Sequence, residues 1–167
     1  MELPKLTLHE TEITRLRQAL DDTDLFVRSY AAIALADLGA TDGDELLLYL
    51  LSVVDYKSLP GPQFLIYEEA VPRIGERRLA QAVEQLLASI DETHEPGPND
   101  LRQEAAWALG EIGDTRAAPR LLQMVREDFF LDAQCALEAL RKLGPEIAAE
   151  AEDAWNAREN KGPGHQR

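Results

Sequence analysis

The chain has 167 residues, enough for one domain around a hydrophobic core, and its 45% hydrophobic content excludes a disordered chain. The formal net charge is −14, which disfavours binding to nucleic acids and to anionic membrane surfaces, because both carry negative charge. The acidity either serves solubility alone or complements a protein partner with a basic surface.

Residues 7–20 form the first predicted helix, because Ile13, Leu16 and Leu20 recur at the spacing of one helix face. This helix precedes a series of repeats. We expect it to cover the first repeat as a cap, because a terminal unit of a stacked array needs a polar outer side.

Similar segments follow, and each ends in a glycine. They span residues 27–39, 101–113 and 136–144, with a weaker copy at 70–75. Their glycines, which lie 31 to 38 residues apart, are Gly39, Gly75, Gly113 and Gly144. The apolar positions of the first copy, which have helical spacing, are Val27, Ala31, Ala34, Leu35 and Leu38. Each copy therefore predicts a helix that a glycine terminates in the left-handed conformation. The small residues that would let a neighbouring helix approach closely are Ala31, Ala34, Ala105 and Ala108.

A second helix is predicted after each glycine, over residues 44–54, 77–90, 115–127 and 145–157. Pro119 falls in the first turn of its helix, where proline is tolerated, whereas Pro72 is expected to kink or shorten the first helix of the second repeat. Asp24 and Asn99 precede first helices and are predicted to cap them. Residues 1–157 would form one domain, and residues 158–167 a disordered tail.

Two predicted loops, residues 55–63 and 91–100, each contain Pro-Gly-Pro, and the two tripeptides lie 36 residues apart. They would therefore fall at equivalent places on one edge of the array. Such matched insertions often lie on a functional edge. The alternative is that they are longer connections between repeats.

The most regular copy lies in residues 99–127. There Leu101-Arg102, Ala105-Ala106, Ala108-Leu109-Gly110 and Ile112-Gly113-Asp114 run into Ala117-Ala118-Pro119 and Leu121-Leu122. This pattern resembles the HEAT repeats of the phycobilisome-lyase-like group, and the resemblance covers about residues 21–145. It implies an all-α fold, a right-handed α-α superhelix in the form of a short solenoid with about four helix pairs and an N-terminal capping helix. It implies almost nothing about activity.

The resemblance also implies a role for Arg28 and Arg102, which hold equivalent positions. In related repeats this arginine reaches an acidic residue of an adjacent repeat, so we expect a structural ladder, with anion binding as the alternative. The fourth repeat departs from the pattern, because Ala133 stands at this position.

Reactive side chains are few. The histidines His9, His94 and His165 lack the spacing of metal ligands, and Cys135 has apolar neighbours that favour a structural thiol. We therefore expect no catalytic, cofactor-binding or metal-binding residues and no enzyme activity. Cys135 is the only cysteine, residues 1–10 lack the pattern of a secretion signal, and the longest apolar run, residues 46–51, cannot span a membrane. A cytoplasmic, bacterial-type protein is the expectation.

The second helices of a solenoid usually line an extended concave face that grips proteins. Their predicted inward residues are Leu47, Leu51, Val83, Leu87, Leu121 and Val125. The predicted protein-binding residues on the opposite side are Glu45, Tyr49, Gln81, Gln85, Arg120 and Gln123. Tyr49 would be the energetic anchor, because aromatic side chains dominate interface hot spots.

The main hypothesis is a non-enzymatic module that binds a basic protein partner, as an adaptor, a scaffold or an inhibitor of the immunity-protein type. The alternative is a bilin lyase or tetrapyrrole-chaperone subunit, which would need positive groups for the propionates. A nucleic-acid enzyme on a helical scaffold is a third hypothesis, which the acidic balance disfavours.

Overall fold

The computed structural model describes residues 8–53, 62–92 and 101–159, and in these residues the chain is helical without a β-strand. The all-α prediction is therefore confirmed. The α-helices are α1 (Leu8–Ala19), α2 (Leu25–Asp37), α3 (Asp44–Val53), α4 (Pro62–Glu76), α5 (Val83–Glu92), α6 (Leu101–Ile112), α7 (Ala118–Glu127), α8 (Phe130–Leu143) and α9 (Pro145–Glu159). Two short 3₁₀ helices, η1 (Ala80–Ala82) and η2 (Thr115–Ala117), lead into α5 and α7.

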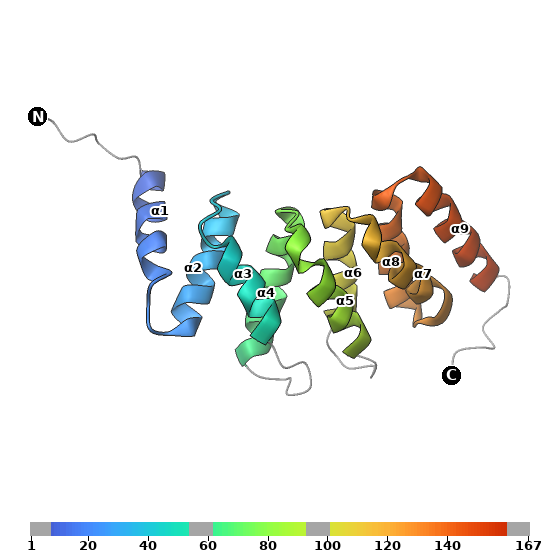
Figure 1. Cartoon of the computed structure of the whole chain (residues 1–167), viewed down its shortest axis with the longest axis horizontal. Helices are drawn as coiled ribbons and strands as arrows, with labels where there is room; N and C mark the ends of the chain where they lie inside the picture. Colours follow the sequence, from blue (N-terminus) through green and yellow to red (C-terminus); the bar gives the residue numbers. More distant parts are fainter. Residues whose placement is uncertain (1–7, 54–61, 93–100, 160–167) are drawn as a thin grey trace, which may run out of the picture.

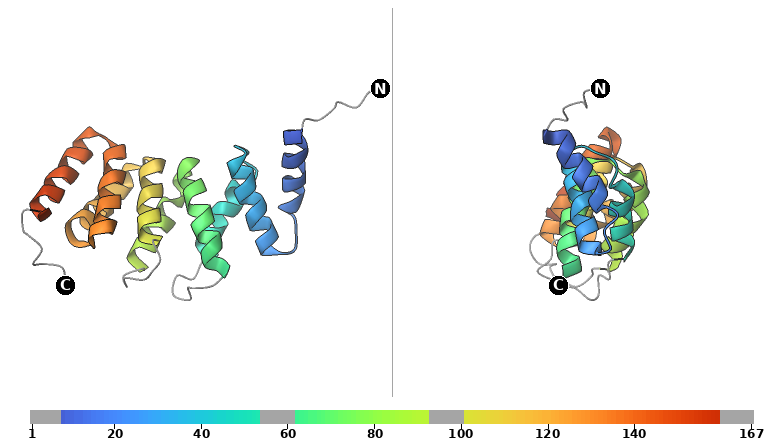
Figure 2. Two further views of the ribbon diagram at one scale, coloured as in Figure 1. Left: turned by 180° about the vertical axis from the view of Figure 1, so that it is seen from behind. Right: turned by 90° about the vertical axis from the view of Figure 1, so that its left-hand side faces the viewer.

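The helices form a row of antiparallel pairs along the long axis of the molecule, from α1 at one end to α9 at the other (Figure 1). The pairs are α2–α3, α4–α5, α6–α7 and α8–α9, and each packs on the next. Viewed from behind, α2, α4, α6 and α8 form one layer, with α3, α5 and α7 on the other side and α9 at the end of the row (Figure 2). This arrangement confirms the predicted short solenoid, and α1 packs on α2 as the expected leading helix.

The core runs between the two layers through all repeats. In α6, Leu101, Ala105 and Leu109 recur at helical spacing, and all three are buried. The inward residues predicted for the second helices are also buried, apart from Leu87, which is partly buried against the same core. The pattern of apolar residues thus places the two layers correctly.

Small residues set the spacing between consecutive first helices. A Cβ atom added to Gly75 would lie 2.9 Å from the Cα of Ala108, and one added to Gly110 would lie 2.7 Å from the Cα of Ala139. Both glycines lie inside helices that pack on the next first helix. Ala108 therefore has the predicted role of allowing close approach, and Gly110 has it as well.

The end of α4 differs from the prediction. α2 ends with Gly39 at a φ of 73°, and the amides of Gly39 and Ala40 bond to the carbonyls of Ala36 and Leu35. In α4 the equivalent left-handed residue is Arg78, at a φ of 55°, with the same two backbone bonds from Arg78 and Leu79. Gly75 is therefore the counterpart of Gly110 inside a helix, and the prediction that it terminates the helix was wrong.

Arg78 consequently holds a conformation that an L-residue adopts at a cost of about 1 kcal/mol. We expect Arg78→Gly to raise the free energy of unfolding by up to about 1 kcal/mol, less the larger entropy that glycine has in the unfolded chain. Urea denaturation measures the change. Arg78→Ala is the control, since alanine keeps the Cβ atom, and an equal gain in both variants would contradict the backbone explanation.

Other helix boundaries also differ from the predicted ones. Pro72 does not shorten its helix, because α4 continues to Glu76 with Ala70, Val71 and Ile74 buried around the proline. The helix expected from residue 77 begins at Ala80 as η1, because Arg78 first reverses the chain. At the C-terminal end, α9 reaches Glu159, two residues into the expected tail. Its Arg158 donates hydrogen bonds to the carbonyls of Val125 and Asp128, which hold this last turn against α7.

Candidate functional site

The predicted binding residues lie on α3, η1, α5 and α7. Side chains that are exposed as predicted are those of Glu45, Tyr49, Gln81, Gln85 and Gln123. Tyr49 on α3 is 48% exposed, and Gln123 on α7 bonds to Glu127 in the next turn. These five side chains are thus accessible, and their part in binding stays a prediction.

Arg120 is the exception, because its side chain is only 16% exposed. Its Nε atom donates a 2.5 Å hydrogen bond to Asp91 at the end of α5. The guanidinium thus connects two repeats. A partner protein would have to break this ion pair to bind Arg120. We therefore interpret Arg120 as a residue that joins two repeats.

Ion pairs of this kind join the elements along the chain. Arg17 pairs with Asp42, Arg73 with Asp37, Arg77 with Asp44, Arg116 with Glu84, Arg126 with Glu150, Arg141 with Glu152 and Lys142 with Glu111. Each pair connects different helices or repeats. In the described residues most basic side chains therefore pair with carboxylates of the same chain, and the acidic residues of the chain outnumber the basic ones.

Arg102 forms the most buried of these networks. Its side chain is 12% exposed and contacts Asp128, which follows α7, and Asp132 on α8. Its Nη1 atom also donates a 2.8 Å bond to the carbonyl of Ile90 at the end of α5. The expected ladder between adjacent repeats is confirmed for Arg102. For Arg28, the Nε atom is buried without a hydrogen bond to the described residues.

The ion pair between Arg17 and Asp42, near the N-terminal end, changes the pKa of the Asp42 carboxyl. The hydrogen bond from Arg17, on α1, to Asp42, just before α3, lowers the pKa of the Asp42 carboxyl, and the smaller opposing effect is desolvation. A carboxyl whose folded pKa is depressed stabilises the fold above its unfolded value, about pH 4, and this stabilisation is lost as the pH falls through the folded pKa.

We therefore expect the Asp42 carboxyl to titrate below the normal range for aspartate and to return towards it in Arg17→Met. NMR detection of the side-chain carboxyl carbon across the acid range measures both midpoints. Arg15→Met is the matched control, because Arg15 lies exposed on the same helix. Equal midpoints in the wild type and Arg17→Met would contradict the assignment.

Exposed apolar side chains gather on one edge of the solenoid. All the first helices begin at this edge, the lower one in Figure 1. Of the seven large exposed hydrophobic side chains in the described parts of the chain, six lie at or near it, in two stretches, one with Phe26, Val27 and Tyr30 and one with Phe129, Phe130 and Leu131. The two Pro-Gly-Pro loops, predicted to share one edge of the array, fall largely outside the described residues. Neither stretch was predicted as a surface feature, although Phe129-Phe130-Leu131 directly after the second helix predicted at 115–127 was a visible signal.

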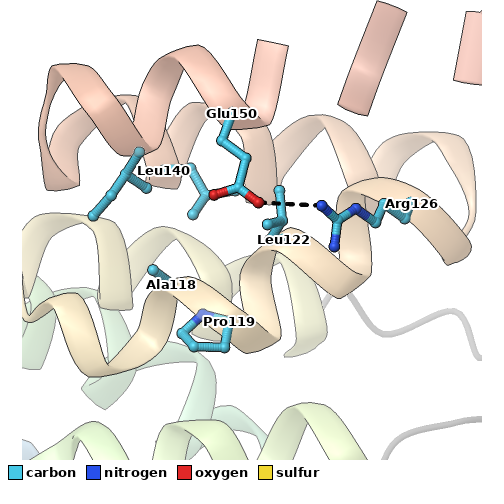
Figure 3. A pocket seen from close by; sticks show the side chains of 7 residues that line it. Ala118, Pro119, Leu122, Arg126, Leu140 and Glu150 are labelled. Atoms are coloured by element: carbon cyan, nitrogen blue, oxygen red, sulfur yellow. Dashed lines mark hydrogen bonds and ion pairs between the residues drawn. The ribbon is translucent and has the colours of Figure 1, made fainter. Parts of the chain in front are cut away.

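A shallow groove of about 310 Å³ lies between α7, α8 and α9. Ala118, Pro119, Leu122, Leu140 and Ile147 form its apolar walls. Figure 3 shows Arg126 and Glu150 meeting across it, with 3.2 Å between Nη2 and Oε1. The cation that lines the groove is therefore already neutralised.

Groups suited to chemistry are sparse where the structure describes the chain. His9 is exposed on α1, and His94 and His165 fall outside the described residues. Cys135 is partly buried, as expected, with its Sγ atom 4.0 Å from the Gln103 side-chain oxygen. Across residues 8–53, 62–92 and 101–159, no three His, Cys, Asp or Glu side chains are grouped to hold a metal ion, and no helix is long and apolar enough to cross a membrane.

Residues 62–141 match the family model of HEAT repeats. This match covers α4 to most of α8, which includes the regular third repeat and the degenerate second one. The HEAT resemblance is confirmed for this part of the chain. No curated protein matches the sequence. HEAT repeats generally mediate protein binding, so the match points to an interaction scaffold.

Proposed function

We propose that the protein is a non-enzymatic interaction module, an adaptor, scaffold or inhibitor, whose partner is a protein with a basic surface. The observation that carries the proposal is that most of the described Lys and Arg side chains form ion pairs within the chain. At least nine of the thirteen Lys and Arg residues in the described ranges contact a carboxylate of the chain itself.

The remaining acidic groups set the surface potential. The chain has 31 acidic residues against 17 basic ones, so internal pairing cannot neutralise the excess. A potential of one sign over an extended surface speeds the encounter with a partner of opposite charge and rejects partners of like charge. The repeats form an extended row (Figure 1), which gives such a partner a long face to contact.

The finer assignment to the phycobilisome-lyase-like group, with a bilin lyase or tetrapyrrole-chaperone role, is less well supported. A tetrapyrrole carries propionate groups that need cations nearby. The groove between α7, α8 and α9 offers Arg126, which Glu150 already neutralises. This observation favours the protein-binding proposal.

The test is affinity capture with the full chain, followed by binding measurements with each captured protein in purified form. We expect partners of high isoelectric point whose dissociation constants rise about tenfold or more between low salt and about 0.5 M salt, because salt screens opposed charges. Purified partners that are acidic, or that bind equally well at both salt concentrations, would overturn the proposal.

A further inference from the structure

The α1–α2 corner combines an uncovered apolar patch with a group of carboxylates. Phe26, Val27 and Tyr30, on the first turns of α2, are 40%, 41% and 49% exposed. Residues three and four apart are neighbours on a helix surface, so Tyr30 lies beside both Phe26 and Val27. The three side chains therefore form one continuous apolar surface, which we call the α2 patch.

Three aspartates flank the α2 patch. Asp21, Asp22 and Asp24 are exposed in the turn that leads into α2. Asp22 accepts the amide of Asp24, and Asp24 accepts the amide of Phe26, each through one carboxylate oxygen. These bonds fix the turn and leave the second oxygen of each carboxylate available for a ligand. The one cation within this segment is Arg28, whose Nε atom is buried.

The equivalent positions of other repeats differ in residue type, burial and ion pairing. Leu101 of α6 corresponds to Val27 and is buried, and Glu104 corresponds to Tyr30. At the other end of the edge, Phe130 packs on Trp155 at 5.3 Å between ring centroids, and Arg102 neutralises the neighbouring Asp128 and Asp132. The α2 patch, by contrast, joins exposed aromatic side chains to three exposed aspartates, and no ion pair to these aspartates is seen within the described residues.

We propose that the α2 patch binds a basic amphipathic helix of a partner protein. Large apolar side chains on one face of that helix would cover Phe26, Val27 and Tyr30, and its Lys or Arg residues would meet Asp21, Asp22 and Asp24. A second copy of this chain fits poorly, because both copies carry a charge of −14. The inference rests on the proposed function and adds the binding surface and the form of the partner.

The experiment uses the full chain and a fluorescent synthetic helix of about 18 residues, long enough for five turns, with leucines on one face and lysines on the other. One control peptide replaces the leucines with serine, and a second replaces the lysines with glutamate. Fluorescence anisotropy at about 0.15 M salt gives the dissociation constants. We expect the leucine-lysine helix to bind at least tenfold tighter than either control.

Two variants test whether the leucine-lysine helix binds at the α2 patch. Phe26→Ser with Tyr30→Ser is expected to weaken binding of the leucine-lysine helix about tenfold or more, because aromatic anchors carry much of the binding energy. Asp21→Asn with Asp22→Asn and Asp24→Asn removes three charges and keeps an oxygen acceptor at each position, so the cap of α2 survives. This variant should also weaken binding, most strongly at low salt.

Leu131→Ser is the matched control, because Leu131 is 60% exposed at the other end of the same edge. It should bind the helix like the wild type, and circular dichroism should show that all variants are folded. Folded patch variants with unchanged affinity would overturn the inference. So would equal binding of the leucine-lysine and serine-lysine peptides, although recognition of basic partners would then still stand.

Discussion

Arg102→Met is expected to lower the free energy of unfolding by about 3 kcal/mol, the lower end of the range for breaking a buried ion pair. Arg102 is 12% exposed and joins three segments, through Asp128, Asp132 and the carbonyl of Ile90. Methionine keeps most of the aliphatic stem but leaves two carboxylates close together without a cation. The loss of stability should therefore come from like charge and from unpaired polar groups.

Urea denaturation of the full chain measures this change, with two further variants for comparison. Arg102→Lys keeps the charge without the planar fork and should lose less than Arg102→Met. Arg126→Ala breaks an exposed pair, 52% and 61% exposed, and should stay within about 0.5 kcal/mol of the wild type. An Arg102→Met variant as stable as Arg126→Ala would show that the network contributes no net stability.

The fold could be predicted because the signals for each helix pair lie within a short stretch of the sequence. Helical spacing of alanine and leucine, a glycine after α2, α6 and α8 and the proline at position 119 define the pairs without long-range information. The wrong prediction for Gly75 shows the limit of such local signals. A glycine can mark a left-handed residue or a close approach between helices, and the sequence does not distinguish these uses. Arg78 holds the left-handed position because the bonds from the amides of Arg78 and Leu79 to the preceding turn outweigh a modest local cost.

The candidate site was harder to predict, because exposure depends on the neighbouring repeat. Val27 and Leu101 hold the same register, and both fit the apolar face of a helix, yet Val27 is 41% exposed and Leu101 is buried. α5 packs over α6, whereas the described residues place the leading helix α1 on the corresponding side of α2. The position of Arg120 was missed for a similar reason, since its partner Asp91 lies 29 residues away in another repeat.

Gly110→Val is the second substitution with a large expected effect, a loss of about 3 kcal/mol in the free energy of unfolding. The added Cβ would lie 2.7 Å from the Cα and 2.9 Å from the Cβ of Ala139. These are atoms of a packed helix, so α6 and α8 must move apart to relieve the contact. The movement would open the core on both sides, where Leu109 and Leu140 are fully buried.

Gly110→Ala separates packing from helix propensity. Alanine favours a helix over glycine by about 1 kcal/mol, so its added methyl group should stabilise α6 unless contact with α8 prevents it. We expect a net loss, smaller than that of Gly110→Val. Ala149→Val, at an exposed position of α9, is the control for a β-branched residue in a helix and should cost less than about 1 kcal/mol. A Gly110→Ala variant more stable than the wild type would mean that the first helices can separate freely. The spacing between repeats would then be set by the ion pairs that join them, and Arg102→Met should in that case be the more damaging of the two changes.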